Sequence, residues 1–322
     1  MPLLSRIFGA FTMDVIATTA FGTKLDSHHD PDNPFVKNAQ RIFNQEFRWF
    51  FIFIFIFPSL LKIITKFSPD YLVFFKDITE KLIKERKENP DVKRYDFLQM
   101  LMDELNEEEM NDPTDPNFKD DRQTVFPGLT KDEIAAQCIL FFMAGYETTA
   151  STLSHCVYML ALNPECQDRL AAEVDNALSA EDVTLDYDTV KTLPYLEAVI
   201  SETLRLLPPG TRMERQAARN YKLKDTETEI PKDMIVQFPV YAMHRDPEFF
   251  PDPEKFDPER FLPENKDNIR PFTYLPFGAG PRNCIAERFA LLEVKLCLAK
   301  VIQKLQFHRV PETKVLIFSF IS

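Results

Sequence analysis

The sequence predicts a mainly helical chain with small β-sheets, an α+β architecture, and three observations support this prediction. Long apolar stretches in both halves are bounded by residues that start and stop helices. Residues 211–240 differ, because they contain short β-like runs separated by charged turns. Of the 322 residues 45% are hydrophobic, which is enough for one large core or two smaller ones. We see no internal repeat and no domain boundary, and we therefore expect a single domain over residues 1–322.

The first half is expected to form helices joined by polar connections. Residues 8–21 are apolar with small spacers and are followed by Gly22, which favours a helix that ends there. Residues 71–87 are amphipathic, and Asn89-Pro90 follows them. Residues 103–126 are acidic and contain prolines, so we predict a solvated loop.

The most hydrophobic segment covers residues 49–64 and has two interpretations. Arg48 and Lys62 bracket it and Pro58 interrupts it, whereas a membrane-spanning helix needs about 20 apolar residues. We interpret it as a core segment, and the alternative is a surface that dips into a bilayer.

A long central helix has a clear start signal. Thr130 and Glu133 have the spacing of a capping box, in which each side chain bonds a backbone N–H of the other residue. We predict a helix from there to about Leu162, roughly 48 Å long at 1.5 Å per residue, and buried because it is apolar around much of its circumference. Asn163 is expected to cap the next helix, with Pro164 in its first turn.

The second half is expected to contain two further helices. Pro194 opens one through Leu207, and residues 285–305 form an amphipathic helix near the C-terminus. Between them lie the β-like residues 211–240 and a proline-rich stretch, 244–271, which we interpret as an irregular, packed meander.

Composition excludes several classes of function. The formal net charge of −12 argues against a nucleic-acid-binding protein, which usually presents a basic face. Five cysteines without a CxxC pair argue against a disulfide scaffold or a zinc cluster. The chain has no Asn-x-Ser/Thr acceptor and no secretory pattern at its N-terminus, so a reducing, cytosol-facing compartment fits best.

One cysteine, Cys284, follows two glycines and an arginine in residues 276–290, PFGAGPRNCIAERFA. Cys284 lies at the start of the last helix, whose partial positive charge stabilises a thiolate. Gly278 and Gly280 allow a tight turn and close approach of a flat ligand, Arg282 suits a carboxylate such as a haem propionate, and Phe277 would shield the sulfur. These features suit a thiolate ligand of iron, but for Cys284 taken alone a buried free cysteine at a helix start is the favoured interpretation. A dinucleotide-binding GxGxxG is incomplete because position 283 is Asn.

A second constellation, AGYETT at residues 144–149, lies inside the long central helix. Ala144 and Gly145 leave room for a flat group or small molecule near the backbone. Thr148 can loosen the helix by bonding a carbonyl one turn earlier, and Glu147 supplies an acid. Together they could form a proton-delivery groove, but for these six residues alone a notch where small residues pack is the favoured interpretation.

Two further patterns follow in the chain. Glu202 and Arg205 lie on one face of an apolar helix, so we predict a buried ion pair with Arg260 of the PERF sequence as a third member. That trio would be a structural clamp. The residues that follow this helix, 209–215, can line a pocket and offer an arginine to an anion.

The order AGYETT, ETLR, PERF, FGAGPRNCIA resembles the cytochrome P450 monooxygenases over nearly the whole chain. The stretches FTMDVIATTAFG and YAMHRDPEFFPDPEKFDPERF resemble the microsomal group that includes the liver drug-metabolising enzymes and thromboxane synthase. The resemblance implies the cytochrome P450 fold, haem b as cofactor, and insertion of one oxygen atom from O2 into a lipophilic substrate.

The resemblance also assigns roles at matching positions. Cys284 would be the axial thiolate and the metal ligand, and its electron donation favours O–O cleavage. Thr148 and Glu147 would be the catalytic pair that guides protons. The remaining cofactor-binding residues would be Arg282, Arg215, Phe277, Gly278, Ala144 and Gly145. The positions Ala144, Gly145, Gly210, Thr211, Arg212 and Met213 match residues near the substrate.

Partners follow from the same resemblance. Electrons would come from NADPH through a flavoprotein, NADPH-cytochrome reductase, docked on the cysteine-side face. Lys295, Lys300 and Lys304 would add positive charge there, or would simply form a solvated helix face. Residues 49–57 would roof the pocket and touch the membrane, and the protein would lie on the cytosolic side of the endoplasmic reticulum.

This sequence departs from the family pattern in two respects. Ala286 stands where the cysteine motif ends in glycine, and alanine is small enough to be tolerated. The chain also begins where the family's fifth major helix begins, so we expect the membrane anchor, the first helices and a Trp-x-x-x-Arg propionate site to be absent, and the terminal β-hairpin as well. Two alternative readings are therefore a truncated, non-catalytic family member and a haem-binding isomerase on the same scaffold.

Overall fold

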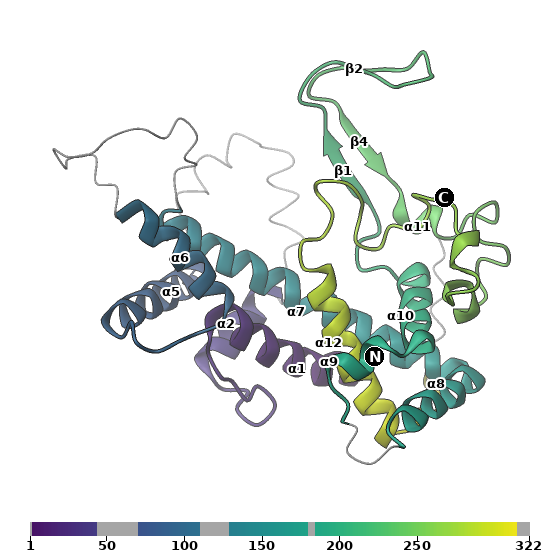
Figure 1. The fold of residues 1–322 in the computed structure, drawn as a ribbon, viewed down its shortest axis with the longest axis horizontal. Coiled ribbons are helices and arrows are strands. Elements are labelled where there is room, and N and C mark those ends of the chain that lie inside the picture. The colour runs from purple at the N-terminus through teal and green to yellow at the C-terminus, as the bar shows by residue number, and fades with distance from the viewer. Residues whose placement is uncertain (1, 44–69, 110–128, 180–183, 314–322) are drawn as a thin grey trace. The chain divides into compact units, whose positions relative to one another are not determined.

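The computed structural model describes residues 2–43, 70–109, 129–179 and 184–313 (Figure 1). The described chain divides into two compact units, one formed by Arg6–Glu147 and the other by Met1–Ser5 with Thr148–Ser322. We call them the N-terminal unit and the C-terminal unit. The single haem-thiolate domain expected over residues 1–322 stays a prediction. The hydrophobic segment 49–64 lies outside the described residues.

In its described residues, the N-terminal unit contains four helices and the first half of a fifth. They are α1 (Pro2–Phe21), α2 (Pro34–Phe43), α5 (Asp70–Glu88), α6 (Phe97–Glu109) and the first half of α7 (Lys131–Leu162). Its core is an aromatic cluster in which Phe35, Phe75 and Phe142 meet with ring centroids 5.0 to 5.4 Å apart. Each ring comes from a different helix, so the cluster joins α2, α5 and α7.

The end of α1 is fixed by Gly22, as the sequence predicts. Gly22 has a φ of +64°, and a Cβ there would lie 2.5 Å from Asp96 Oδ2 and 2.7 Å from an Arg86 nitrogen. Arg86 and Asp96 form a two-pronged ion pair at 2.7 and 2.9 Å, and Arg86 also donates to the Phe21 carbonyl. Glycine is therefore required both by its φ and by the space that this ion pair occupies.

The predicted acidic loop at 103–126 is wrong in its first part, because α6 extends to Glu109. Asp96 precedes this helix and accepts a hydrogen bond from the Gln99 N–H at 2.9 Å, which caps the first turn. The residues that follow are rich in Leu, Met and Glu, which are strong helix formers. Residues 110–128 lie outside the described part of the chain.

Helix α7 starts and ends as predicted. Thr130 N–H donates to Glu133 Oε2 at 2.8 Å and Glu133 N–H donates to Thr130 Oγ1 at 3.3 Å, which confirms the capping box. Burial is uneven along the helix. Its C-terminal part is largely buried, whereas its middle carries an exposed stripe that the prediction of a buried helix did not anticipate. The exposed residues of this stripe are Leu140, Met143, Ala144, Glu147 and Thr148.

In its described residues, the C-terminal unit contains the second half of α7 and four further helices. They are α8 (Pro164–Ala177), α9 (Tyr187–Lys191), α10 (Pro194–Leu206) and α12 (Glu287–Lys304), and a short α11 (Val240–Met243) follows the strands. Pro164 opens α8 as expected, but Asn163 does not cap it with its side chain. The amide of Asn163 instead donates backwards to the Met159 carbonyl at 2.8 Å, which closes the end of α7.

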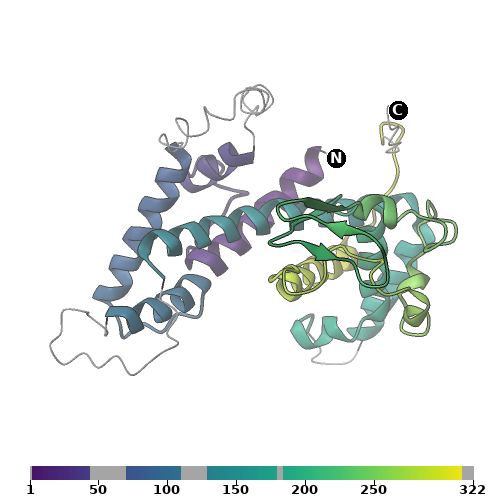
Figure 2. The same cartoon turned by 90° about the horizontal axis from the view of Figure 1, so that it is seen from above.

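Two small antiparallel sheets confirm the α+β prediction for residues 211–240. Strand β1 (Met213–Gln216) pairs with β4 (Ile235–Phe238), with Met213 opposite Phe238, and β2 (Tyr221–Lys222) pairs with β3 (Glu229–Ile230). The chain from 244 to 286 is an irregular meander with two 3-10 turns, η2 (Pro258–Phe261) and η3 (Lys266–Asn268). The segment before α12 passes beside the β1–β4 ribbon in both views (Figures 1 and 2).

The predicted structural clamp is confirmed. Arg205 binds Glu202 through two hydrogen bonds of 2.7 and 2.8 Å, both side chains are fully buried, and Arg260 lies 3.6 Å from the same carboxylate. Burial raises the pKa of Glu202, and the Arg205 guanidinium opposes that shift. The Asp257 N–H adds a further bond to Glu202 at 2.8 Å, so the clamp ties α10 to the meander.

Candidate functional site

The loop before α12 is closed by its own backbone. The Cys284 N–H donates to the Phe277 carbonyl at 2.8 Å, and the Asn283 N–H donates to the Gly280 carbonyl at 3.1 Å. Gly278 and Gly280 have φ values of +77° and +79°, which side-chain-bearing residues rarely adopt. The two glycines therefore make the tight turn that the sequence predicts.

Gly278 also meets a side chain from β1. A Cβ at this position would lie 2.9 Å from the Met213 sulfur and 3.7 Å from the Asn283 Cα, whereas a Cβ at Gly280 would meet nothing within 4 Å. Met213 thus packs directly on the cysteine loop, and of the two loop glycines only Gly278 is constrained by both its conformation and its neighbour.

Cys284 differs from every other cysteine of the chain in its exposure. All five cysteines are free thiols, and Cys284 is exposed. The others are partly buried (Cys297) or buried (Cys138, Cys156 and Cys166). Burial raises the pKa of the Cys138, Cys156 and Cys297 thiols to about 12 and also raises that of Cys166. Those four thiols are held in the protonated, unreactive form, so Cys284 is the accessible sulfur.

The two arginines assigned to propionates lie together. Arg215 of β1 donates from one guanidinium nitrogen to the Arg282 carbonyl at 3.2 Å and from the other to the Glu214 carbonyl at 2.8 Å. Both arginine residues are exposed, and the Arg282 guanidinium makes no hydrogen bond within the described residues. Two positive charges therefore flank the cysteine loop with capacity to bind an anion.

The α7 candidates belong mostly to the N-terminal unit. Ala144 and Glu147 are exposed on the stripe described above, and so is Thr148, the first residue of α7 in the C-terminal unit. Gly145 packs against α1, because a Cβ there would lie 2.8 Å from Ile16 Cδ1, as the packing-notch alternative predicts. One turn later in the same helix, the Thr152 hydroxyl donates to the Thr148 carbonyl at 2.8 Å.

The sequence matches the model of one protein family over most of its length. The model of the family "Cytochrome P450" matches residues 4–319. The chain belongs to the cytochrome P450 family. The family prediction and its fold are thereby confirmed.

Similar proteins place the chain more closely. It is 40% identical over 318 residues to cytochrome P450 3A2 of Rattus norvegicus, 40% over 320 residues to cytochrome P450 3A6 of Oryctolagus cuniculus and 40% over 318 residues to cytochrome P450 3A41 of Mus musculus. Each match covers 97% of this chain and 60% of the relative, so the chain spans about three fifths of the length of these P450 proteins.

The cysteine loop suits the haem of a P450. The exposed Cys284, the backbone turned by two glycines and the two flanking arginines offer a sulfur ligand, room for close approach and partners for two carboxylates. Ile285, directly after the cysteine, has 85% of its surface exposed, and Phe289 is also exposed. Large apolar side chains beside an exposed sulfur favour a flat, apolar ligand on this surface.

Alanine in place of the final glycine of the cysteine motif is accommodated without strain. Ala286 has φ −95° and ψ 12°, which any residue can adopt, and it serves as the N-cap of α12. Its carbonyl accepts the Ala290 N–H at 2.9 Å, so the helix begins normally.

His244 is a supporting residue that the sequence analysis missed. It is fully buried, its Nε2 accepts the Leu275 N–H at 2.8 Å, and its Nδ1 lies 3.2 Å from the Arg205 carbonyl. Burial lowers the pKa of His244 to about 4, so the ring is neutral and carries its proton on Nδ1. His244 therefore links the clamp to the segment that leads into the P450 cysteine loop. No local sequence pattern predicts this role.

The lysines assigned to reductase docking are not equivalent. Lys295 is largely buried and donates to Glu197 Oε2 at 3.1 Å, so its charge is neutralised within the unit, contrary to the docking interpretation. Lys300 and Lys304 are exposed. Of the three, only these two remain as candidates for a positive docking surface.

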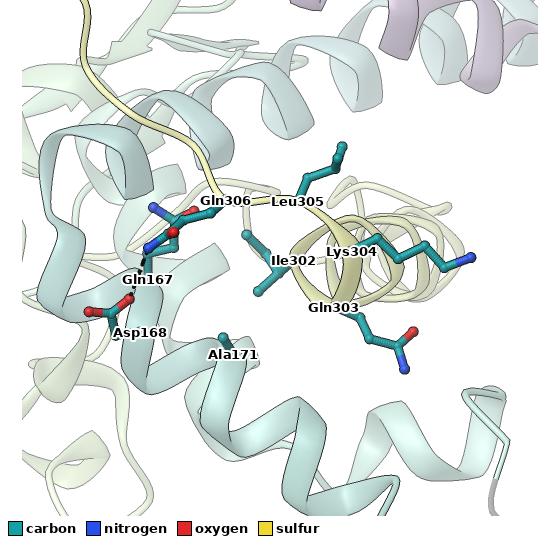
Figure 3. Close-up of a pocket in the computed structure, with 8 residues that line it drawn as sticks. All are labelled: Gln167, Asp168, Ala171, Ile302, Gln303, Lys304, Leu305 and Gln306. Carbon is teal, nitrogen blue, oxygen red and sulfur yellow. Dashed lines mark hydrogen bonds between the residues drawn. The ribbon is translucent and has the colours of Figure 1, made fainter.

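A cavity of about 240 Å³ lies at the far end of α12 (Figure 3). Gln306 Nε2 donates to Asp168 Oδ1 at 3.5 Å at its edge, and the Gln167 amide binds both the N–H and the carbonyl of Phe307. Since α12 has 18 residues and spans about 27 Å, this cavity is separate from the cysteine loop. Its lining residues are Gln167, Asp168, Ala171, Ile302, Gln303, Lys304, Leu305 and Gln306.

No three His, Cys, Asp or Glu side chains in the described part of the chain are placed to hold a metal together. Among the same residues, no helix combines the length and the apolar character that crossing a membrane requires.

Proposed function

We propose that this chain binds haem b through Cys284 and forms part of a cytochrome P450 monooxygenase. The observation that carries the proposal is the single accessible thiol, in a loop shaped by two left-handed glycines and flanked by Arg215 and Arg282. Family membership and the similarity to cytochrome P450 3A proteins support it.

The residues of the cysteine loop would hold the cofactor from one side. Cys284 would ligate iron as a thiolate, and backbone N–H groups near the start of α12 would stabilise its charge. Arg282 and Arg215 would bind the propionates, Gly278 would allow close approach, and Phe277 would cover the sulfur. The family resemblance also implies cofactor-binding roles for Ala144 and Gly145 of α7.

When bound, thiolate-ligated haem supplies the activation of O2 that allows one oxygen atom to be inserted into a lipophilic substrate. Glu147 and Thr148 would hold and pass protons, because both are exposed and adjacent on α7. A carboxylate beside a hydroxyl can take a proton from water and present it at the hydroxyl oxygen. The apolar stripe residues Leu140 and Met143 suit a lipophilic substrate.

Partners and location are proposed for the same reasons. Electrons would come from NADPH through a flavoprotein reductase, with Lys300 and Lys304 contributing to its docking surface. The protein would act at the cytosolic face of the endoplasmic reticulum membrane. The whole protein's activity, substrate and partners are proposals, since the chain spans 60% of the length of its relatives.

Haem titration of residues 1–322 tests the proposal. The chain is mixed with haem, reduced and exposed to carbon monoxide, and we expect the strongly red-shifted absorption band of a thiolate-ligated carbonyl complex. Cys284→Ala should abolish the shifted band, and the matched control Cys297→Ala should retain it because that thiol is partly buried and protonated.

Other outcomes separate the alternatives. Absence of haem uptake contradicts the proposal and supports a non-catalytic chain. Haem uptake without oxygen consumption in the presence of reductase and NADPH supports the isomerase alternative. Equal loss of the band in both cysteine variants removes Cys284 as the assigned ligand.

A further inference from the structure

Helix α12, which follows the cysteine loop, contains a buried glutamate, Glu293, that has no cationic partner among the described residues. Glu293 has 7% of its surface exposed, and its Oε1 is buried with no hydrogen-bond partner among the described residues. Neither of its carboxylate oxygens takes part in an ion pair in that part of the chain. An ionised carboxylate in such a place loses its hydration without compensation, so the neutral acid is favoured.

The cations on the elements around α12 are engaged elsewhere. Helices α8, α9 and α10 pack against α12 within the C-terminal unit. Arg205 binds Glu202, Arg169 binds Glu259 at 2.7 Å, and Lys191 lies over the Tyr187 ring. On α12 itself, Lys295 binds Glu197. None of these four cations forms an ion pair with Glu293.

The remaining titratable neighbours cannot stabilise an anion either. Cys297 lies one turn along α12 and interacts electrostatically with Glu293, and it faces Cys156 of α7. Burial raises the pKa of both thiols to about 12, so both are neutral. Glu173 of α8 caps α10 by accepting the Tyr195 and Leu196 N–H groups. Lys300 of α12 is exposed and acts electrostatically on Cys297, and it forms no ion pair with Glu293 in the described part of the chain. The buried groups around Glu293 are thus neutral or already paired.

We propose that Glu293 is a pH-sensitive element of α12: its carboxyl is protonated in the folded chain, and its ionisation at alkaline pH loosens the helix that follows the cysteine loop. Ala286 is the N-cap of this helix, so Glu293 lies about two turns from the loop. Loosening α12 withdraws support from the Cys284 turn. This inference is independent of haem binding and applies to the chain with or without cofactor.

The direction of the pH effect follows from linkage. Burial raises the pKa of Glu293 from 4.5 to about 8. Between pH 4.5 and about pH 8, Glu293 is therefore protonated in the folded chain and ionised in the unfolded chain. Stability is therefore greatest at the acidic end of this window and falls as the pH rises to about 8, where the effect levels off. Within the window the unfolding equilibrium constant changes by up to about tenfold per pH unit.

Unfolding of the full 322-residue chain at a series of pH values tests the proposal. Glu293→Gln mimics the neutral acid, and Glu197→Gln, which removes an acid already paired with Lys295, is the matched control. We expect Glu293→Gln to gain stability over the native chain progressively from about pH 5 to about pH 8, and Glu197→Gln to keep the native pH dependence. A gain that does not change with pH overturns the proposal.

A second measurement addresses the helix itself. Amide hydrogen exchange, corrected for the intrinsic effect of pH, should become faster in residues 287–304 of the native chain above about pH 8 and should stay unchanged in Glu293→Gln. Glu293→Met provides a second neutral side chain of similar size. If neither neutral variant folds while Glu197→Gln does, a charged carboxylate is required in the core and the proposal is wrong.

Discussion

Arg205 and His244 each bind the other's backbone carbonyl. The Arg205 guanidinium donates to the His244 carbonyl at 2.7 Å, and the His244 ring lies with Nδ1 3.2 Å from the Arg205 carbonyl. Because His244 also accepts the Leu275 N–H, the reciprocal pair connects the C-terminal turn of α10 to the chain that leads into the cysteine loop. The clamp and the loop are therefore parts of one hydrogen-bonded network, which leads to the first two predictions.

Removal of Arg205 should be strongly destabilising. Arg205→Met leaves the Glu202 carboxylate buried with fewer partners and deprives the His244 and Lys255 carbonyls of their donor. We expect a loss of about 3–5 kcal/mol in the free energy of unfolding, measured by denaturant titration. Lys222→Gln, which breaks an exposed pair with Glu227, should cost about 1 kcal/mol or less. Equal losses would show that the clamp is solvated.

Acid should destabilise the fold through His244. Burial lowers the pKa of His244 from 6.5 to about 4. Between these pH values His244 is protonated in the unfolded chain and neutral in the folded chain. The stabilising preference for the neutral ring is present above pH 6.5 and is lost as the pH falls towards 4, by up to about 3 kcal/mol. His244→Gln should flatten this part of the stability profile, whereas the exposed His308→Gln should not. An unchanged profile in His244→Gln would contradict this assignment.

The two glycines of the cysteine loop should respond differently to alanine. Gly280→Ala requires only a left-handed alanine, at a cost of about 1–2 kcal/mol. Gly278→Ala adds a clash with the Met213 sulfur at 2.9 Å, so it should cost more and should also weaken haem retention. Thermal unfolding and haem dissociation rates measure the two effects. A larger effect at Gly280 would show that contact with Met213 is unimportant.

Cys284 should be the fastest of the five thiols to react with an alkylating reagent. Three of the others are buried and the fourth is partly buried, with a pKa raised to about 12, so they present little thiolate. Peptide mass mapping after a brief treatment of the native chain should find modification at Cys284 first, and denatured protein should be modified at all five. Prior addition of haem should protect Cys284 if it ligates the iron. Rapid labelling of Cys297 in the native chain would contradict its partial burial.

Local signals predicted the elements that are fixed by short-range chemistry. The capping box at Thr130 and Glu133, the prolines that open α8 and α10 and the Gly22 terminus all depend on residues a few positions apart. The buried Glu202–Arg205 pair was predictable for the same reason, since both residues lie on one helix face.

Long-range contacts account for what the sequence did not predict. His244 acquires its role from Arg205 and Leu275, which are 39 and 31 residues away. The pairing of Lys295 with Glu197 spans 98 residues and removed a lysine from the expected docking surface. The length of α6 differs from the prediction because the helix propensity of Leu, Met and Glu extends it into the acidic stretch, to Glu109.

The contact between Met213 and Gly278 has a consequence for how the protein matures. The cysteine turn takes its final shape against a strand more than sixty positions earlier, which itself must pair with β4. A ligand that recognises the finished turn binds the folded chain and not the unfolded one, so its capture shifts the folding equilibrium towards completion. Cofactor supply would then limit not only activity but the amount of folded protein that survives in the cell.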